Sequence, residues 1–415
     1  MKCKLIIKKV IILLLIFSCT FIQISYADER EEEDNENIIN EIRIEESNVI
    51  NSSNNENKIP VINSRKYVIY DRKSGLRIYG KNEYKQSAMA STTKIMTAIV
   101  VLENCKNIDE EVIIEQKAAG TGGSRLGLKN GDKITVNDLL FGLLMKSGND
   151  AAIALAIHTA ETVEKFADLM NKKAQELGLE HTHFVTPHGL DDPNHYTTAY
   201  ELAKLTDYAL KNDIIATMVK TKYATISING IKKELKNTNE LLCGNYEGVY
   251  GVKTGFTNNA GRCLVTAVKR GNIDLIVVVL EADTRKARAS DTMKLIEYAY
   301  KTYRLENVEQ KIEEEFENWK SINKDRIYIY KANSQLNLKM DEIKIKELVT
   351  EKDINIEINS INYLEAPINK NTKIGTIIVK NGEDIIEEID ILVANTINRL
   401  GISDYLRMFA KVYCL

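Results

Sequence analysis

The sequence has few of the residues that build metal centres or a disulfide framework. It contains six cysteines in 415 residues. They are Cys3, Cys19, Cys105, Cys243, Cys263 and Cys414, and none shows the short spacing of zinc ligands. We interpret each of the four beyond the N-terminal segment as a buried thiol, and a disulfide between two of them stays open.

The histidine and glycine patterns of cofactor sites are missing as well. His181, His183, His188 and His195 fall within one short segment rich in turn residues, without the His-x-x-x-His spacing of a helical zinc site. The segment therefore predicts a loop. The run from Gly120 to Ser124 lacks the Gly-Lys-Ser/Thr ending of a phosphate-binding loop. We expect no metal ion and no other cofactor.

The N-terminus carries a targeting signal. Four lysines precede the apolar run Val10 to Phe17, and Ser25-Tyr26-Ala27 supplies a small-x-small cleavage site. This pattern predicts a signal peptide over residues 1–27, so the bulk of the chain is exported. An uncleaved anchor is the alternative, because apolar residues continue to Ile24.

An excess of positive charge is also lacking. The formal net charge is −3, and losing the four lysines of the signal peptide lowers it to about −7. Nucleic acid is therefore not an expected partner. Residues 28–64 are rich in Glu, Asp, Asn and Ser and predict a disordered acidic spacer.

The segment that follows Met89 carries the first candidate for chemistry. Ile95 to Leu102 is almost continuously apolar without Gly or Pro, which predicts a buried helix whose first turn holds Ser91 and Lys94 on one face. A serine becomes a nucleophile when a base takes its proton, and a lysine can be that base if burial or a nearby cation lowers its pKa. The alternative is a serine N-cap beside a solvated lysine.

Two further motifs follow at wide intervals. Ser147-Gly148-Asn149 falls between a periodic helix that starts after Thr135 and a second apolar helix, so it predicts a tight turn that could aim a hydroxyl and an amide at a site. Lys253-Thr254-Gly255 falls on a strand beside two buried strands, Cys263 to Val268 and Ile273 to Leu280. A cation, a hydroxyl and a close-approaching glycine suit a substrate carboxylate.

The pattern divides the chain into domains. We expect an α/β domain over residues 65–305, a charged connector over 306–322 and a β-rich domain over 323–396. Residues 397–415 predict an amphipathic helix, which could lie in a membrane interface or dock on the β domain.

The three motifs together resemble the active-site set of the penicillin-recognising serine enzymes. The residues around each motif are also similar to those of the low-molecular-mass D-alanyl-D-alanine carboxypeptidases of peptidase family S11. These stretches are Ala90 to Thr97, Leu144 to Ala152 and Gly251 to Thr257. The resemblance implies a β-lactamase/DD-peptidase-like domain, an antiparallel sheet flanked by helices plus a helical subdomain, with a small mainly β domain after it. It also implies action at the outer face of the cytoplasmic membrane or in the cell wall.

By this resemblance, Ser91 attacks a peptidoglycan stem peptide that ends in D-Ala-D-Ala and forms an acyl-enzyme that water hydrolyses. The resemblance makes Lys94 the general base, Ser147 a proton relay and Asn149 a contact to the substrate amide. Lys253, Thr254 and Gly255 would hold the terminal carboxylate, and the backbone N–H groups of Ser91 and Phe256 the oxyanion. β-Lactams would be covalent inhibitors.

Three alternatives stay open. A class A β-lactamase shares the first and third motifs, but it has Ser-Asp-Asn at the second and a deacylating loop that this sequence lacks. A DD-endopeptidase would use the same residues on cross-linked stems. A non-catalytic scaffold that binds the wall would tolerate altered motif residues, and none of the key positions is altered.

Overall fold

The computed structural model describes residues 59–413, which divide into two compact units between Lys301 and Thr302. The predicted signal peptide and most of the predicted spacer lie outside the described residues, and so does Cys414. Ser64, the last residue of the predicted spacer, is already buried in the first unit, where its N–H and hydroxyl both donate to Asp291. A single serine in a polar stretch gives no sequence signal for such burial.

The first unit is built on a five-stranded antiparallel sheet in the order β2-β1-β9-β8-β7. Its strands are β1 (Lys66–Asp71), β2 (Arg77–Lys81), β7 (Val249–Thr257), β8 (Gly261–Arg270) and β9 (Ile273–Ala282). The predicted first hairpin pairs β1 with β2, and the two predicted buried strands pair as β8 and β9. β7, which carries Lys253-Thr254-Gly255, lies at the edge beside β8.

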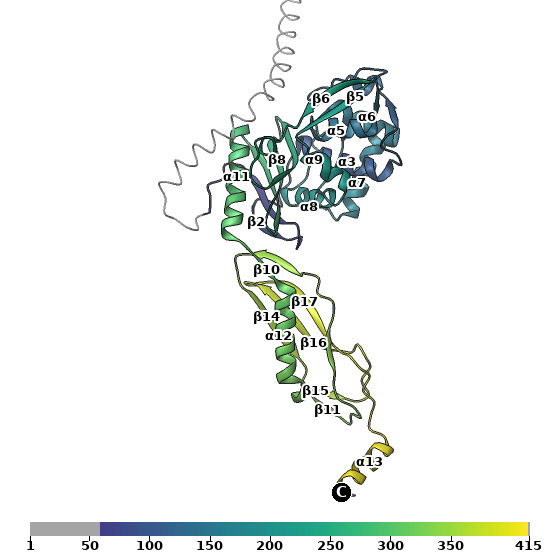
Figure 1. Cartoon of the computed structure of the whole chain (residues 1–415), viewed down its shortest axis with the longest axis vertical. Helices are drawn as coiled ribbons and strands as arrows, with labels where there is room; N and C mark the ends of the chain where they lie inside the picture. Colours follow the sequence, from purple (N-terminus) through teal and green to yellow (C-terminus); the bar gives the residue numbers. More distant parts are fainter. Residues whose placement is uncertain (1–58, 414–415) are drawn as a thin grey trace, which may run out of the picture. The chain divides into compact units, whose positions relative to one another are not determined.

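Alternate residues of each strand point to opposite sides of the sheet. Because the central strands are apolar at consecutive positions, both faces of the sheet are apolar. On one face, Val277 and Val279 pack with Met293 and Ile296 of α11 (Arg285–Thr302). On the other face, Ile276, Val278 and Leu280 belong to the core shared with the helical group. Figure 1 shows α11 on one side of the sheet and the helical group on the other.

The helical group holds the first two motifs. It comprises η1 (Ala90–Thr93), α3 (Lys94–Asn104), α4 (Gln116–Ala119), α5 (Val136–Leu144), α6 (Asn149–Ala160), α7 (Val163–Glu176), α8 (Ala199–Ala209) and α9 (Asp213–Lys220). The short α10 (Glu240–Cys243) instead packs its Leu241 into the cluster on the α11 face. Two small ribbons join the helical group, β3 (Glu111–Ile113) with β4 (Lys133–Thr135), and β5 (Tyr223–Ile228) with β6 (Ile231–Lys236).

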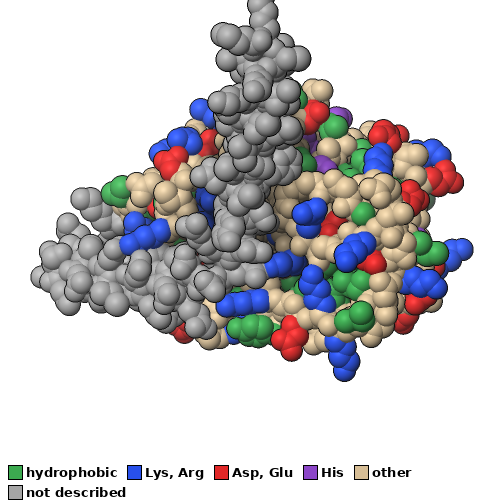
Figure 2. Space-filling model, turned by 90° about the horizontal axis from the view of Figure 1, so that it is seen from above, with side chains coloured by type: hydrophobic (Ala, Val, Ile, Leu, Met, Phe, Trp, Pro, Cys, Tyr) green, Lys and Arg blue, Asp and Glu red, His purple; other side chains and the backbone are tan. Residues whose placement is uncertain are grey.

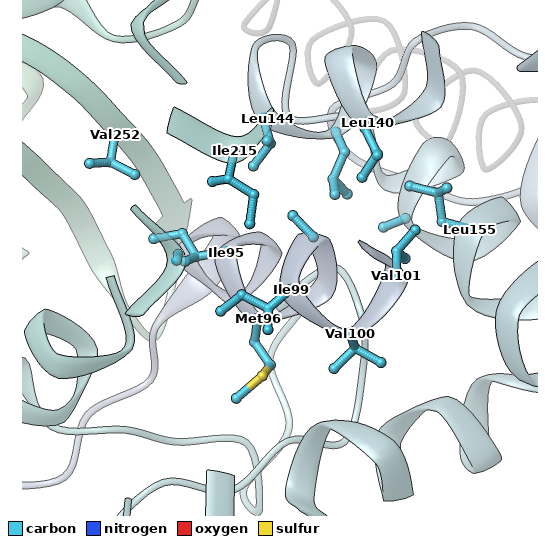
Figure 3. Packing of buried hydrophobic residues seen from close by; sticks show 14 of the residues in the cluster. Ile95, Met96, Ile99, Val100, Val101, Leu140, Leu144, Leu155, Ile215 and Val252 are labelled. Carbon is cyan, nitrogen blue, oxygen red and sulfur yellow. The ribbon is translucent and has the colours of Figure 1, made fainter. Parts of the chain in front are cut away.

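Helix α3 is the centre of this core. Ile95 and Ile99 are buried and pack with Leu144 of α5, Ile215 of α9 and Val252 of β7, as Figure 3 shows. Each such buried side chain contributes about 1.5–3 kcal/mol to the stability of the fold. The helix that starts at Lys94 is therefore held from all sides.

The second unit is a small, mainly β domain. Its four-stranded sheet has the order β12-β17-β16-β14, and two ribbons pair β10 with β13 and β11 with β15. The strands are β10 (Arg304–Asn307), β11 (Tyr328–Tyr330), β12 (Leu338–Met340), β13 (Glu347–Thr350), β14 (Ile354–Ser360), β15 (Tyr363–Glu365), β16 (Lys373–Asn381) and β17 (Asp384–Val393). The fold class expected from the sequence is thereby confirmed.

Residues 306–322, expected to be a charged connector, contribute instead to the core of the second unit. They fall largely in α12 (Val308–Asn323), where Val308, Ile312 and Phe316 are buried. These residues recur every fourth position among many charges, so the apolar stripe is narrow and the composition hides it. A short 3₁₀ helix, η2 (Lys324–Arg326), follows.

The described chain ends in α13 (Ile402–Tyr413). The turn before it is fixed to the β domain, because the N–H of Leu400 donates to the carbonyl of Lys331 at 2.8 Å. Within residues 59–413, every helix is too short or too polar to cross a bilayer.

Candidate active site

A strained turn presents Ser91. The sequence predicts an α-helix over Ser91 and Lys94, but residues 90–93 form the 3₁₀ helix η1 and the α-helix starts at Lys94. The difference arises because Ala90 has a positive φ of 48° and because the hydroxyls of Thr92 and Thr93 donate to the carbonyls of Met89 and Ala90. A non-glycine residue adopts such a φ at an energetic cost, which the surrounding contacts offset.

The side chain of Lys94 connects the first two motifs. Its Nζ lies 2.8 Å from Oγ of Ser91 and 2.7 Å from Oδ1 of Asn149, and it donates to the carbonyl of His188 at 2.9 Å. The residue is fully buried. Burial lowers the pKa of Lys94 well below its usual range, the nearby cation Lys253 lowers it further, and Asp150 opposes both. The arrangement favours a neutral amine beside the serine hydroxyl.

The second motif forms the tight turn predicted from the sequence. α5 ends at Leu144, Ser147 has a φ of 62°, and α6 starts at Asn149. The backbone N–H of Asn149 donates to Ser124, and its side-chain amide donates to Gly122 at 2.7 Å. Ser147 is buried in this turn. The glycine-rich loop is thus a support for Asn149, a role its sequence did not reveal.

The third motif places a strand backbone against Ser91. A Cβ added at Gly255 would lie only 3.1 Å from the backbone nitrogen of Ser91, so glycine allows β7 to approach this closely. Lys253 is buried, and Thr254 shares a hydrogen bond of 2.9 Å with Thr238. The side chain of Phe256 is half exposed and stacks on the guanidinium of Arg262 at 3.7 Å.

A second cation lies behind Lys253, and sequence reasoning missed it. Arg288 of α11 is buried and donates twice to one carboxylate oxygen of Glu240, at 2.6 and 2.9 Å. Its guanidinium also donates to the carbonyl of Cys263, which pairs with Gly255 across β7 and β8. Burial lowers the pKa of Lys253 to about 7, with a further contribution from Arg288.

The histidine-rich loop also supports the site. The Nδ1 of His195 accepts from the N–H of Val185 at 2.9 Å, so its Nε2 carries the proton and donates to the hydroxyl of Thr93 at 2.8 Å. Gly189 of the same loop packs against Ala90. The sequence predicted this segment as a loop, and only its spatial position reveals its contact with η1. Among the described residues, no cluster of three or more His, Cys, Asp or Glu side chains is arranged to hold a metal ion.

A fully buried lysine bonded to a serine at the start of a helix, with an asparagine and a second lysine beside them, defines a serine enzyme of the acyl-transfer class. Residues 53–284 match the family described as D-alanyl-D-alanine carboxypeptidase, peptidase S11. The chain belongs to this family and is a serine-type carboxypeptidase. Residues 316–399 match the C-terminal domain of penicillin-binding protein 5.

Curated members of this family are similar to the protein over most of its sequence. The D-alanyl-D-alanine carboxypeptidase DacF of Bacillus subtilis is 32% identical over 82% of this chain and 87% of its own. DacA of Haemophilus influenzae is 33% identical over 83% of this chain and 87% of its own. These matches cover both units.

Solved structures give the same result. Penicillin-binding protein 5 from Haemophilus influenzae superposes with a TM-score of 0.67 at 27% identity, over 82% of this chain and 99% of that one. The Streptomyces K15 DD-transpeptidase, at 37% identity and a TM-score of 0.56, covers 59% of this chain and 99% of that one. The expected family and enzyme class are therefore confirmed, and a class A β-lactamase or a scaffold without activity is not supported.

Proposed function

We propose that the protein removes the terminal D-alanine from peptidoglycan stem peptides through an acyl-enzyme on Ser91. The contact of 2.8 Å between Lys94 Nζ and Ser91 Oγ carries the proposal. Neutral Lys94 takes the hydroxyl proton as Ser91 attacks the carbonyl between the two D-alanines. The tetrahedral intermediate collapses, D-alanine leaves with a proton relayed by Ser147, and water then hydrolyses the ester.

Substrate binding is assigned to the second and third motifs. Lys253 and Thr254 hold the terminal carboxylate, Asn149 holds the substrate amide, and the N–H groups of Ser91 and Phe256 stabilise the oxyanion. The close packing of Gly255 on the backbone nitrogen of Ser91 supports the last assignment, because it brings the β7 backbone beside the nucleophile. β-Lactams acylate the same serine.

The test is D-alanine release from a diacyl-L-Lys-D-Ala-D-Ala peptide. Wild-type protein releases D-alanine and penicillin stops the release, whereas Ser91→Ala is inactive. Release by Ser91→Ala at the wild-type rate would disprove the assignment. A cross-linked dimer of stem peptides offered in parallel separates carboxypeptidase from endopeptidase activity.

We further propose that the protein is exported and touches the membrane surface through α13. Ile402, Tyr405 and Leu406 recur along one side of this helix and are exposed, while Arg407 and Lys411 lie on the other side. An amphipathic helix of this kind binds at the boundary of headgroups and acyl chains. The lysine-led apolar segment before Ala27 supports export.

Sedimentation with anionic lipid vesicles tests the membrane contact. The mature chain is expected to co-sediment, and a chain ending at residue 402 is expected to stay in solution. Leu406→Glu should weaken binding more than Ser403→Glu, which adds the same charge away from the apolar side. Equal sedimentation of full-length and shortened chains would contradict the proposal.

A further inference from the structure

The segment from Lys220 to Lys236 carries an excess of positive charge. It contains Lys220, Lys222, Lys232, Lys233 and Lys236 but a single acid, Glu234, in a protein whose net charge is −3. The segment runs from the end of α9 through the hairpin of β5 and β6. Figure 2 views the molecule from the end where Figure 1 shows this hairpin, and on that face Lys and Arg side chains are interspersed with Asp and Glu side chains.

The hairpin has an inner and an outer face. Ile226 and Leu235 are buried on the inner face, against the core of the first unit. On the outer face, Lys232 lies opposite Ser227, and Lys236 lies opposite Tyr223, which is 63% exposed. Glu234 lies between the two lysines on this face, opposite Thr225. Within residues 59–413, neither Lys232 nor Lys236 has a salt-bridge partner.

Two contacts fix the hairpin at the rim of the active site. Lys233, on the inner face, donates to the carbonyl of Leu126 at 2.5 Å, in the loop that supports Asn149. Beyond the end of β6, Thr238 is hydrogen-bonded to Thr254 of the carboxylate-binding motif. The two outer lysines therefore stand on a strand whose position relative to the catalytic groups is set from both sides.

We propose that the outer face of this hairpin binds carboxylate groups of the stem peptide beyond its D-Ala-D-Ala end. The proposal rests on the proposed function, because it takes the stem as the substrate. Lysine supplies a flexible point charge that suits a carboxylate held near a surface. Such a surface adds affinity for the polymer and selects among stems by their side-chain acids, without taking part in the bond-breaking step.

The experiment compares two peptides that share an L-Lys-D-Ala-D-Ala end preceded by D-Glu. One carboxyl group of D-Glu forms the peptide bond to L-Lys. The other is a free carboxylate in the first peptide and is amidated in the second. The wild-type protein is expected to have the higher kcat/KM with the free carboxylate, and the preference should disappear at about 1 M salt, where the screening length is about 3 Å. Lys232→Glu/Lys236→Glu should lose about threefold or more on the free carboxylate and stay unchanged on the amide.

Two matched variants complete the test. Lys172→Glu reverses one lysine at an exposed position of α7, the same charge change as each of the two hairpin substitutions, and should leave the preference intact. Lys232→Arg/Lys236→Arg keeps the charge and should retain it as well. The inference is overturned if the double glutamate variant keeps the wild-type preference, or if it loses activity equally on both peptides.

Failure of the proposed function would look different. If the wild-type protein cleaves neither peptide, calorimetric binding of the two peptides to the Ser91→Ala protein decides the inference by itself. Tighter binding of the free carboxylate, lost in the double glutamate variant, supports the hairpin surface. Equal binding of both peptides overturns it.

Discussion

The imidazole Nε2 of His195 lies 2.8 Å from the hydroxyl of Thr93, although 102 positions separate the two residues in the sequence. The same hydroxyl of Thr93 donates a hydrogen bond to the carbonyl of Ala90 at 2.8 Å. The chain of hydrogen bonds thus runs from the histidine-rich loop to Ala90, the residue just before Ser91. It holds the positive φ of Ala90 and, with it, the direction of Ser91.

Removing this contact should slow acylation of Ser91. Thr93→Val keeps the shape of the side chain but removes both hydrogen bonds, and a buried group left without its partner costs about 1–3 kcal/mol. We expect the rate of acylation by penicillin to fall at least about tenfold, with little change for Thr93→Ser. Equal rates for Thr93→Val and wild type in stopped-flow labelling would show that the contact does not position the nucleophile.

Acid should destabilise the fold through the same histidine. Burial lowers the pKa of His195 from 6.5 to about 4, so between these values the unfolded chain binds a proton that the native protein does not. Stability therefore rises with pH through this window and is lost as pH falls toward 4, by roughly 3 kcal/mol for this residue alone. His188, whose burial lowers its pKa to about 3, acts in the same direction.

Urea unfolding from pH 4 to pH 7 measures this loss. His195→Gln preserves an N–H donor and an acceptor but does not titrate, so its stability should depend less steeply on pH than that of the wild type. An identical slope for the two proteins would assign the acid sensitivity to other groups.

Loss of the charge on Lys253 should weaken substrate binding at alkaline pH. Burial and Arg288 lower its pKa to about 7, and the carboxylate of the substrate needs the charged form. KM is therefore expected to rise above pH 7, by about tenfold per pH unit well beyond the pKa. In Lys253→Arg the charge persists, so the rise should vanish even if the overall rate falls. A KM that stays constant from pH 6 to 9 in the wild type would contradict this role.

Alanine substitutions at two glycines with positive φ distinguish the cost of backbone strain from the cost of steric crowding. A Cβ at Gly189 would come within 1.9 Å of the carbonyl oxygen of Ala90, whereas one at Gly178 would meet nothing within 4 Å. Gly178→Ala should cost about 1 kcal/mol of stability, from backbone strain alone. Gly189→Ala should cost more than about 3 kcal/mol and should also reduce acylation of Ser91. Similar losses for both variants in urea unfolding would mean that the loop yields to the added methyl group.

The sequence predicted those parts of the site that local spacing determines. Ser91 and Lys94 are three positions apart, a spacing that brings their side chains together in the observed 3₁₀ turn as it would in the predicted α-helix. Ser147 and Asn149 lie in the tight turn that the sequence predicts. The order of β7, β8 and β9 followed from their apolar runs and the turn at Gly271. In these segments, periodicity and turn chemistry point to the same fold.

Contacts between distant segments left no such signal. Glu240 and Arg288 form a buried pair across 48 positions, and each reads in the sequence as an ordinary charged residue. The 3₁₀ turn at Ala90 depends on Thr93, His195 and Gly189, which only the folded chain brings together. In α12, the buried stripe of Val308, Ile312 and Phe316 was too narrow to stand out from its charged surroundings.

The central claim is that Ser91 is acylated with Lys94 as its base, and mass spectrometry of the penicillin adduct tests it most directly. We expect one penicilloyl group on the peptide that contains Ser91, and none in Ser91→Ala. Lys94→Ala should be acylated about 10²- to 10⁴-fold more slowly, the usual contribution of a positioned general base. An adduct on a different residue, or acylation of Lys94→Ala at the wild-type rate, would contradict the account.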